Sequence, residues 1–152
     1  PEARANIHKL FNGHDKIVRT LALTETGYAA VTESNDPDVA AALQKHVKQM
    51  NQRLESGLMA RRWDPAFAEY ARHFRSLEHR FEPTEKGVKV TVAGRTPEAV
   101  KVARNHAAII SSFVAGGWTE HDRSHPAVLE KKETPQPAAK ESSGCCGNCC
   151  RK

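Results

Sequence analysis

The sequence predicts an α+β domain built from a duplicated helix–β-hairpin–helix unit, with a four-stranded antiparallel sheet and packed helices. Two observations predict this class. Signals for a helix, a hairpin and a second helix follow one another in the same order in both halves of the chain. Corresponding signals lie about sixty residues apart, which is the pattern that an internal duplication leaves.

The clearest matching signals mark the start of the second helix of each unit. Asp36 precedes Pro37, and Thr96 precedes Pro97. Asp and Thr side chains accept hydrogen bonds from the free N–H groups of a first helical turn, and proline is favoured at the first helical position because it has no N–H. We therefore expect a long helix to begin at each proline and to end at the glycine twenty residues further on.

The hairpins are predicted by glycine-containing turns between runs of alternating apolar residues. One turn lies at 26–27 and the other at 86–87. In the first half we expect strands at 18–25 and 28–33, and in the second half the run at 88–92 is the clearest strand of the chain. The strand pairing between the two halves is not determined by these patterns.

The first helix of each unit is predicted by apolar side chains at intervals of three and four residues. Such a stripe covers residues 7–18. The Asn-Gly pair at 12–13 interrupts it, but the second copy has Ala-Arg at 71–72, so we expect the helix to continue through the pair. The Asp-Pro pair at 64–65 repeats the cap-and-proline signal and starts the corresponding helix of the second unit.

The same signals predict the domain organisation. Residues 1–126 form one folded domain made of two repeats, at about 7–57 and 66–117. Residues 127–144 are rich in Lys, Glu, Pro, Ala and Ser, so they bury too little apolar surface to fold and are predicted to be a flexible linker. Residues 145–152 form a cysteine-rich tail.

Composition limits the class of protein. The 152 residues are 39% hydrophobic and 27% charged, which is typical of a soluble globular domain. No apolar run approaches the roughly 18–20 residues of a membrane span, so we expect none. The net charge of +5 comes from scattered basic residues and aromatics are only 6%, so we expect no nucleic-acid partner. The start at Pro1 and the cysteine-free body favour a periplasmic or otherwise exported location, although the compartment is not determined.

Four of the eight histidines lie on the apolar faces of predicted helices, at corresponding places in the two units: His14, His46, His73 and His106. A buried imidazole without a partner costs about 1–3 kcal/mol, so a single buried histidine is usually hydrogen-bonded in a core. Histidines at four corresponding helix positions would repeat this free-energy cost, which leucine at the same positions would avoid. We therefore predict that these four histidines bind a cofactor or metal, with His46 and His106 each close to His14 or His73.

Two cofactor chemistries fit these histidines. Neutral imidazole is a common ligand of copper and zinc ions, which pairs of these histidines or all four together would hold. The alternative is haem b between two facing histidines, for which the small side chains of Ala103 and Ala107 beside His106 leave room. The sequence has no Cys-x-x-Cys-His motif, which excludes covalent attachment of the c type.

A further metal candidate is the pair His121 and His125, which lie four residues apart. On a helix they would share one face and bind a metal ion, whereas Pro126 immediately after them favours a solvated helix end. His8 and His79 are expected at the surface.

All four cysteines lie in the last eight residues: Cys145, Cys146, Cys149 and Cys150. Thiolates this close together hold soft Cu(I) or tetrahedral Zn(II). The alternative is a redox-labile tail that forms disulfides. A thiolate clamp at the end of a flexible linker suits metal delivery to a protein partner, or docking with one.

Together these patterns predict a metal-binding protein, for copper or zinc binding, storage or transfer, with histidine sites in the core and a cysteine-rich tail. One alternative is a b-type haem protein with bis-histidine ligation, for electron transfer or sensing. Another is a cofactor-free protein-interaction module whose histidines are structural. No Ser-His-Asp arrangement, phosphate loop or nucleotide motif is present, so catalysis is not expected, and a homodimer remains open.

Overall fold

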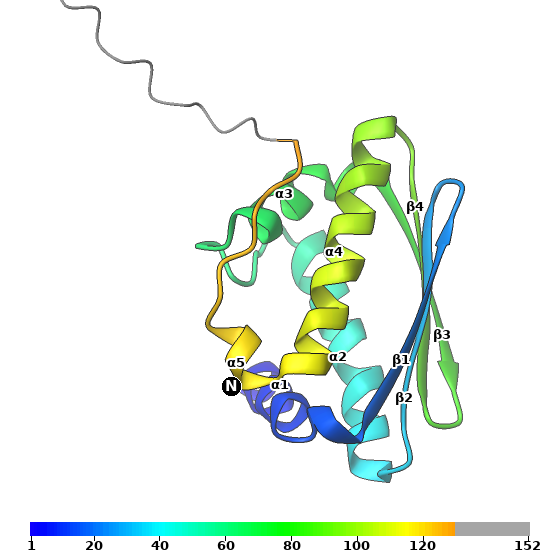
Figure 1. The fold of residues 1–152 in the computed structure, drawn as a ribbon, viewed down its shortest axis with the longest axis vertical. Coiled ribbons are helices and arrows are strands. Elements are labelled where there is room, and N and C mark those ends of the chain that lie inside the picture. The colour runs from blue at the N-terminus through cyan, green and yellow to red at the C-terminus, as the bar shows by residue number, and fades with distance from the viewer. Residues whose placement is uncertain (130–152) are drawn as a thin grey trace, which may run out of the picture.

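The computed structural model describes residues 1–129, in which helices cover one face of a four-stranded antiparallel sheet (Figure 1). This arrangement confirms the predicted α+β class. The elements are, in chain order, α1 (Glu2–Asn12), β1 (Ile17–Thr24), β2 (Gly27–Ser34), α2 (Pro37–Glu55), α3 (Pro65–His73), β3 (Leu77–Thr84), β4 (Gly87–Gly94), α4 (Pro97–Gly116) and α5 (Trp118–His121). Short 3₁₀ turns, His14–Lys16 and Phe74–Ser76, lead into β1 and β3, so the same order of elements occurs in both halves.

The two hairpins join side by side, in the strand order β1-β2-β4-β3. β2 and β4 are antiparallel neighbours at the centre of the sheet, and Gly27 pairs with Ala93 while Glu33 pairs with Gly87. Gly27 thus pairs with the residue that lies sixty positions after Glu33, and Glu33 pairs with the residue that lies sixty positions after Gly27. The ladder between the halves is therefore symmetric, which the sequence pattern had left undetermined.

The two long helices begin at the prolines that the capping signals predicted. The Asp36 carboxylate accepts a hydrogen bond from the N–H of Asp38 at 2.9 Å, and the Thr96 hydroxyl accepts one from the N–H of Ala99 at 3.1 Å. Each proline then occupies the first helical turn. α2 ends at Glu55, two residues before a glycine with φ +76°, and α4 ends directly before a glycine with φ +55°.

The predicted continuation of the first helix through the Asn-Gly pair is wrong. α1 ends at Asn12, and the N–H of Gly13 closes its last turn on the carbonyl of Lys9 at 3.0 Å. A Cβ at Gly13 would lie 3.0 Å from Cγ2 of Val39, so α1 turns where it passes close to α2. The second copy also breaks into a 3₁₀ turn, one residue after His73.

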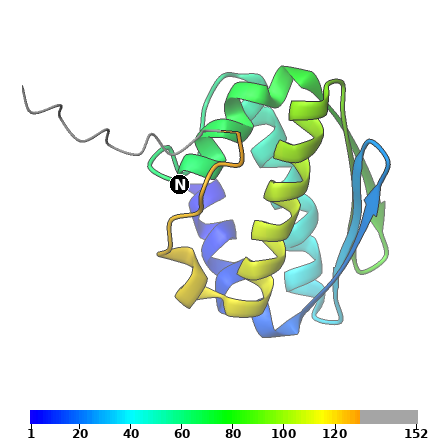
Figure 2. The same cartoon turned by 45° about the horizontal axis from the view of Figure 1, so that its top comes forward.

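The core lies between the sheet and the two long helices, α2 and α4. Its buried centre consists of Tyr28, Ala30, Tyr70, Leu77, Val92, Ala99, Val102, Ala103 and Ala107. Three alanines at four-residue intervals on α4 are fully buried, so that this helix approaches the sheet closely. α1 packs against α2 and α3 against α4, and both views show all helices of residues 1–129 on the same face of the sheet (Figures 1 and 2).

The chain after α5 runs back to α3 (Figure 2). There the Glu69 carboxylate, only 1% exposed, accepts hydrogen bonds from the N–H groups of Val128 at 2.8 Å and Leu129 at 3.1 Å. The packed chain therefore reaches at least Leu129, beyond the predicted boundary at Pro126. The rest of the predicted linker and the cysteine tail lie outside the described residues. Within residues 1–129, no helix is both long and apolar enough to cross a membrane.

Candidate ligand-binding cavity

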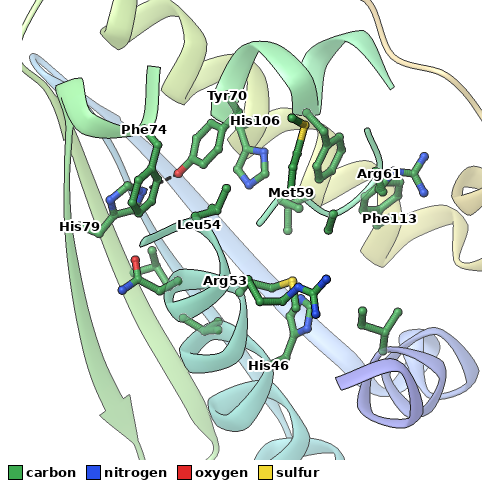
Figure 3. A pocket seen from close by; sticks show the side chains of 18 of the residues that line it. His46, Arg53, Leu54, Met59, Arg61, Tyr70, Phe74, His79, His106 and Phe113 are labelled. Carbon is green, nitrogen blue, oxygen red and sulfur yellow. Dashed lines mark hydrogen bonds between the residues drawn. The ribbon is translucent and has the colours of Figure 1, made fainter. Parts of the chain in front are cut away.

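A cavity of about 270 Å³ lies between the helical layer and the inner face of the sheet (Figure 3). Its walls gather the large apolar side chains of the whole chain. All five Phe and both Tyr of the sequence line it, together with both Met: Phe11, Phe67, Phe74, Phe81, Phe113, Tyr28, Tyr70, Met50 and Met59. The two halves of the chain thus share one aromatic, thioether-containing space.

His46 on α2 and His106 on α4 face this cavity from opposite sides (Figure 3). The Nδ1 atom of each ring is buried and has no hydrogen-bond partner among the described residues. Burial lowers the pKa of His46 to about 4. Burial, with a smaller contribution from the Arg19 charge, lowers the pKa of His106 to about 3. Both imidazoles are therefore neutral at pH 7, which is the form that binds metals.

The ring of His106 is held by aromatic neighbours from α3. Tyr70 stacks on it with ring centroids 3.9 Å apart and planes inclined by 22°, and Phe67 meets it edge-on at 5.2 Å. Burial raises the pKa of Tyr70 well above its ordinary value, so its hydroxyl stays protonated, and it forms a hydrogen bond with Nε2 of His79 at 2.6 Å. These contacts fix the orientation of the His106 ring without using either of its nitrogen atoms.

The expectation that His79 lies at the surface is wrong. β3 alternates, and its inward side carries Leu77, His79 and Phe81, so His79 lies in the cavity wall beside Phe74. Burial lowers the pKa of His79. The alternation of apolar residues around position 79 was the signal that could have placed it.

His14 and His73 do not line the cavity. The Nδ1 atom of His14 donates a hydrogen bond to the carbonyl of Val114 at 2.8 Å, and its ring packs so closely on Gly117 that an added Cβ would lie 2.3 Å away. His73 ends α3. The structure thus brings His46 and His106 to one space and leaves the other two outside it, instead of pairing each with His14 or His73.

The two histidines of the 121–125 pair have different surroundings. α5 ends at His121, so the expected shared helix face does not form. His121 lies in the cavity wall, with Nδ1 2.9 Å from a carboxylate oxygen of Asp122. His125 is buried, with Nδ1 2.7 Å from Asp64 and Nε2 2.8 Å from Glu120. Both nitrogen atoms of His125 are therefore occupied by carboxylates that hold the C-terminal segment to α3.

Arg61, in the loop between α2 and α3, is a cavity residue that the sequence patterns did not predict. Its backbone has φ +54°, and its guanidinium donates to the carbonyls of His121 at 2.8 Å and Arg123 at 2.9 Å and to the Asp64 carboxylate at 3.1 Å. The Nε atom, however, is buried and unpartnered. A histidine on the apolar face of a helix can be recognised from the sequence, whereas a loop arginine with one unpartnered donor cannot.

In the described part of the chain, every buried side-chain polar atom without a partner belongs to a cavity residue. These atoms are Nδ1 of His46, Nδ1 of His106 and Nε of Arg61. Each unpaired buried group costs about 1–3 kcal/mol, and native structures contain few of them. Their concentration in one place makes this cavity the candidate binding site in the described part of the chain.

Among residues 1–129, no group of three or more His, Cys, Asp or Glu side chains is arranged to hold a metal ion. The predicted clamp of Cys145, Cys146, Cys149 and Cys150 lies outside the described residues. No protein-family model matches this chain, and no curated protein or solved structure is detectably similar to it. Function therefore has to be inferred from the cavity itself.

Proposed function

We propose that this protein binds haem b in the cavity, with the imidazoles of His46 and His106 as the axial ligands of the iron. The observation that carries the proposal is the pairing of two neutral, unpartnered imidazoles across a space lined by every Phe and Tyr of the chain. Haem iron already holds the porphyrin nitrogens, so the protein needs to supply only two axial ligands. Two facing histidines whose Nδ1 atoms have no partner among the described residues meet this need.

The size and lining of the cavity support a flat apolar ring. Its volume of about 270 Å³ exceeds the roughly 150 Å³ that holds a benzene molecule and is near the lower end, about 300 Å³, of small-molecule pockets. The wall includes exposed residues, among them Leu58 with 54% exposure, so the cavity reaches the surface there. We infer that the centre of the ring lies between the histidines and that one edge extends through this mouth.

Ligation by two histidines also indicates the kind of function. Both axial positions of the iron are then filled by protein, so no open position remains for a substrate. Electron transfer, or sensing by displacement of one histidine, fits such a site. The absence of a catalytic motif from the sequence agrees with this inference.

The test uses the full chain with all four cysteines changed to serine, because free thiolates would compete for iron. Addition of ferric haem should give a Soret band and the spectrum of a six-coordinate low-spin iron. His46→Ala and His106→Ala should each convert the spectrum to that of a five-coordinate iron. His73→Ala, a half-buried histidine outside the cavity, is the matched control and should leave the spectrum unchanged.

Two results would contradict the proposal. One is the absence of a Soret band in the presence of one equivalent of haem. The other is a spectrum that neither His46→Ala nor His106→Ala alters, because the iron would then be held elsewhere. In either case the cavity histidines would serve the fold or another ligand.

Copper(I) is the second candidate ligand, and the positions of the methionines favour it over zinc. Met50 and Met59 line the same cavity as His46 and His106. Copper(I) binds thioether sulfur and imidazole nitrogen well, whereas zinc prefers thiolate, imidazole and carboxylate. The proposal predicts that Met50→Leu and Met59→Leu weaken copper(I) binding in the cysteine-free chain and leave the haem spectrum six-coordinate. Equal copper(I) affinity in both variants would exclude the thioethers as ligands.

A further inference from the structure

The positive charge of the cavity wall is only partly compensated, because Arg61 is paired with the Asp64 carboxylate at 3.1 Å, whereas Arg19 and Arg53 have no acidic partner among the described residues. Three arginines, Arg19, Arg53 and Arg61, are among the described lining residues, and none of these residues is Asp or Glu. Charges in such an apolar space interact strongly because solvent screens them little. The charges of Arg19 and Arg53 therefore favour a ligand with negative charge.

Arg19 sets the inner end of this positive region. Its guanidinium lies on the sheet and donates hydrogen bonds to the hydroxyls of Ser111 at 3.1 Å and Thr32 at 3.0 Å and to the carbonyl of Ala107 at 3.3 Å. All three acceptors are neutral, so the charge of Arg19 has no counter-ion among them. Arg19 thus contributes positive potential to the cavity and uses three of its five N–H donors within the protein.

Arg53 lies at the other end, on the last turns of α2. It is exposed, lines the cavity and makes no hydrogen bond or ion pair with the described residues. Figure 3 shows its side chain extending from α2 over His46 toward the cavity. A free guanidinium at this position offers a planar pair of donors to an incoming anion.

Arg61 adds a fixed donor to the cavity wall. Its terminal nitrogens are used by the protein, and its position is held by the Trp63 ring, 4.4 Å from the guanidinium carbon. Only the Nε donor remains unpartnered and buried. Arg53 therefore offers an exposed charged guanidinium, and Arg61 offers a single buried N–H.

We infer that the ligand is an organic acid: an apolar ring system with carboxylate groups on one edge, held at the mouth by Arg53 and by Nε of Arg61. The inference rests on the proposed function for the ring, whose carboxylates would be the propionates of haem, but the acidic group follows from the charges of the wall. A carboxylate is satisfied by the two-point hydrogen bonding that a guanidinium supplies.

The test separates the carboxylates from the iron by using metal-free protoporphyrin IX and its dimethyl ester. Binding of each to the full-length, cysteine-free protein is followed by porphyrin fluorescence. The free acid should bind about tenfold more tightly than the ester, since charge-assisted hydrogen bonds are among the stronger polar contacts. Affinity for the acid should also decrease with added salt.

Arg53→Gln should weaken binding of the acid about three- to tenfold, the range of an ion pair that is partly exposed, and leave binding of the ester unchanged. Arg80→Gln is the matched control. Arg80 is exposed on β3 and does not line the cavity, so this variant has the same change of net charge without the change of site.

Equal affinity for acid and ester would overturn the inference, as would an Arg53→Gln variant that loses affinity for both equally or a protein that binds neither ring. Failure of the two proposals is distinguishable. If the preference for the acid depends on Arg53 while the histidine variants leave the haem spectrum unchanged, the proposal of an acidic ligand is supported and the proposal of haem ligation is contradicted. If the histidine variants change the spectrum while acid and ester bind equally, only the carboxylate inference falls.

Discussion

Replacing His46 with leucine separates a histidine kept for binding from one kept for stability. In the ligand-free protein its buried Nδ1 has no partner, and such an atom costs about 1–3 kcal/mol. Leucine fills a similar volume in the apolar wall and removes that cost. We expect His46→Leu to raise the free energy of unfolding at pH 7 by about 1–2 kcal/mol, which corresponds to a rise in Tm of about 3–6 °C.

The pH dependence provides a second and sharper part of this prediction. Burial lowers the pKa of His46 to about 4, whereas an unfolded histidine titrates near 6.5. The unfolded chain therefore binds a proton that the folded chain does not bind between these pH values, so stability falls as the pH decreases from 6.5 to 4. The loss from this residue amounts to about 3 kcal/mol at the acid end, and His46→Leu should abolish that share of the loss.

The measurement is equilibrium urea unfolding followed by far-UV circular dichroism, at several pH values from 7.5 to about 4. His8→Leu is the control, because His8 is exposed and does not line the cavity, and it should change the unfolding free energy little. If His46→Leu were less stable than the natural sequence at pH 7, or lost stability at low pH to the same extent, the histidine would be stabilising the fold. The reasoning that assigns it to a ligand would then fail.

Three further changes test local features. Gly117→Ala should destabilise the protein by more than about 2 kcal/mol, because φ is +55° and the added Cβ would meet the His14 ring. Gly57→Ala, at φ +76° but in open space, should destabilise it by only about 1 kcal/mol. Urea unfolding of the two variants measures this difference. Glu69→Gln should increase amide exchange at residues 128–129, since a neutral amide accepts hydrogen bonds more weakly, and unchanged exchange would refute this anchor. Tyr70→Phe should lower the unfolding free energy by about 1–2 kcal/mol, because Nε2 of His79 loses its hydrogen-bond partner. Equal stability of the variant and the natural protein in a melting experiment would contradict a contribution from this hydrogen bond.

The helices and hairpins could be predicted because their signals are local. A cap followed by proline acts within one turn, as Asp36 and Thr96 do, and a turn glycine fixes a hairpin without any distant contact. The end of α1 could not be predicted in this way. It depends on how closely Gly13 approaches Val39 on another helix, which is a tertiary contact.

The candidate site was predicted only in part. His46 and His106 stood out because helical spacing places them on inward faces, and both line the cavity. Their common space could not be predicted, since it depends on the pairing of β2 with β4. Arg61 was missed because its importance comes from one unused donor in a loop that long-range hydrogen bonds position.

The symmetric β2–β4 ladder has a consequence for the assembly of the site. His46 belongs to the first half of the chain and His106 to the second, so neither half alone holds both imidazoles. A lone unit of this design would complete the cavity only by pairing with a second copy through the same strand, as a twofold homodimer does with a self-complementary surface. Because the two halves are covalently linked, they are always present at a fixed ratio. The residues that each half contributes to the cavity wall can then be substituted independently of those from the other half. Arg53 and its counterpart sixty positions on, Phe113, illustrate such divergence, because one wall of the cavity now carries a charge where the other carries an aromatic ring.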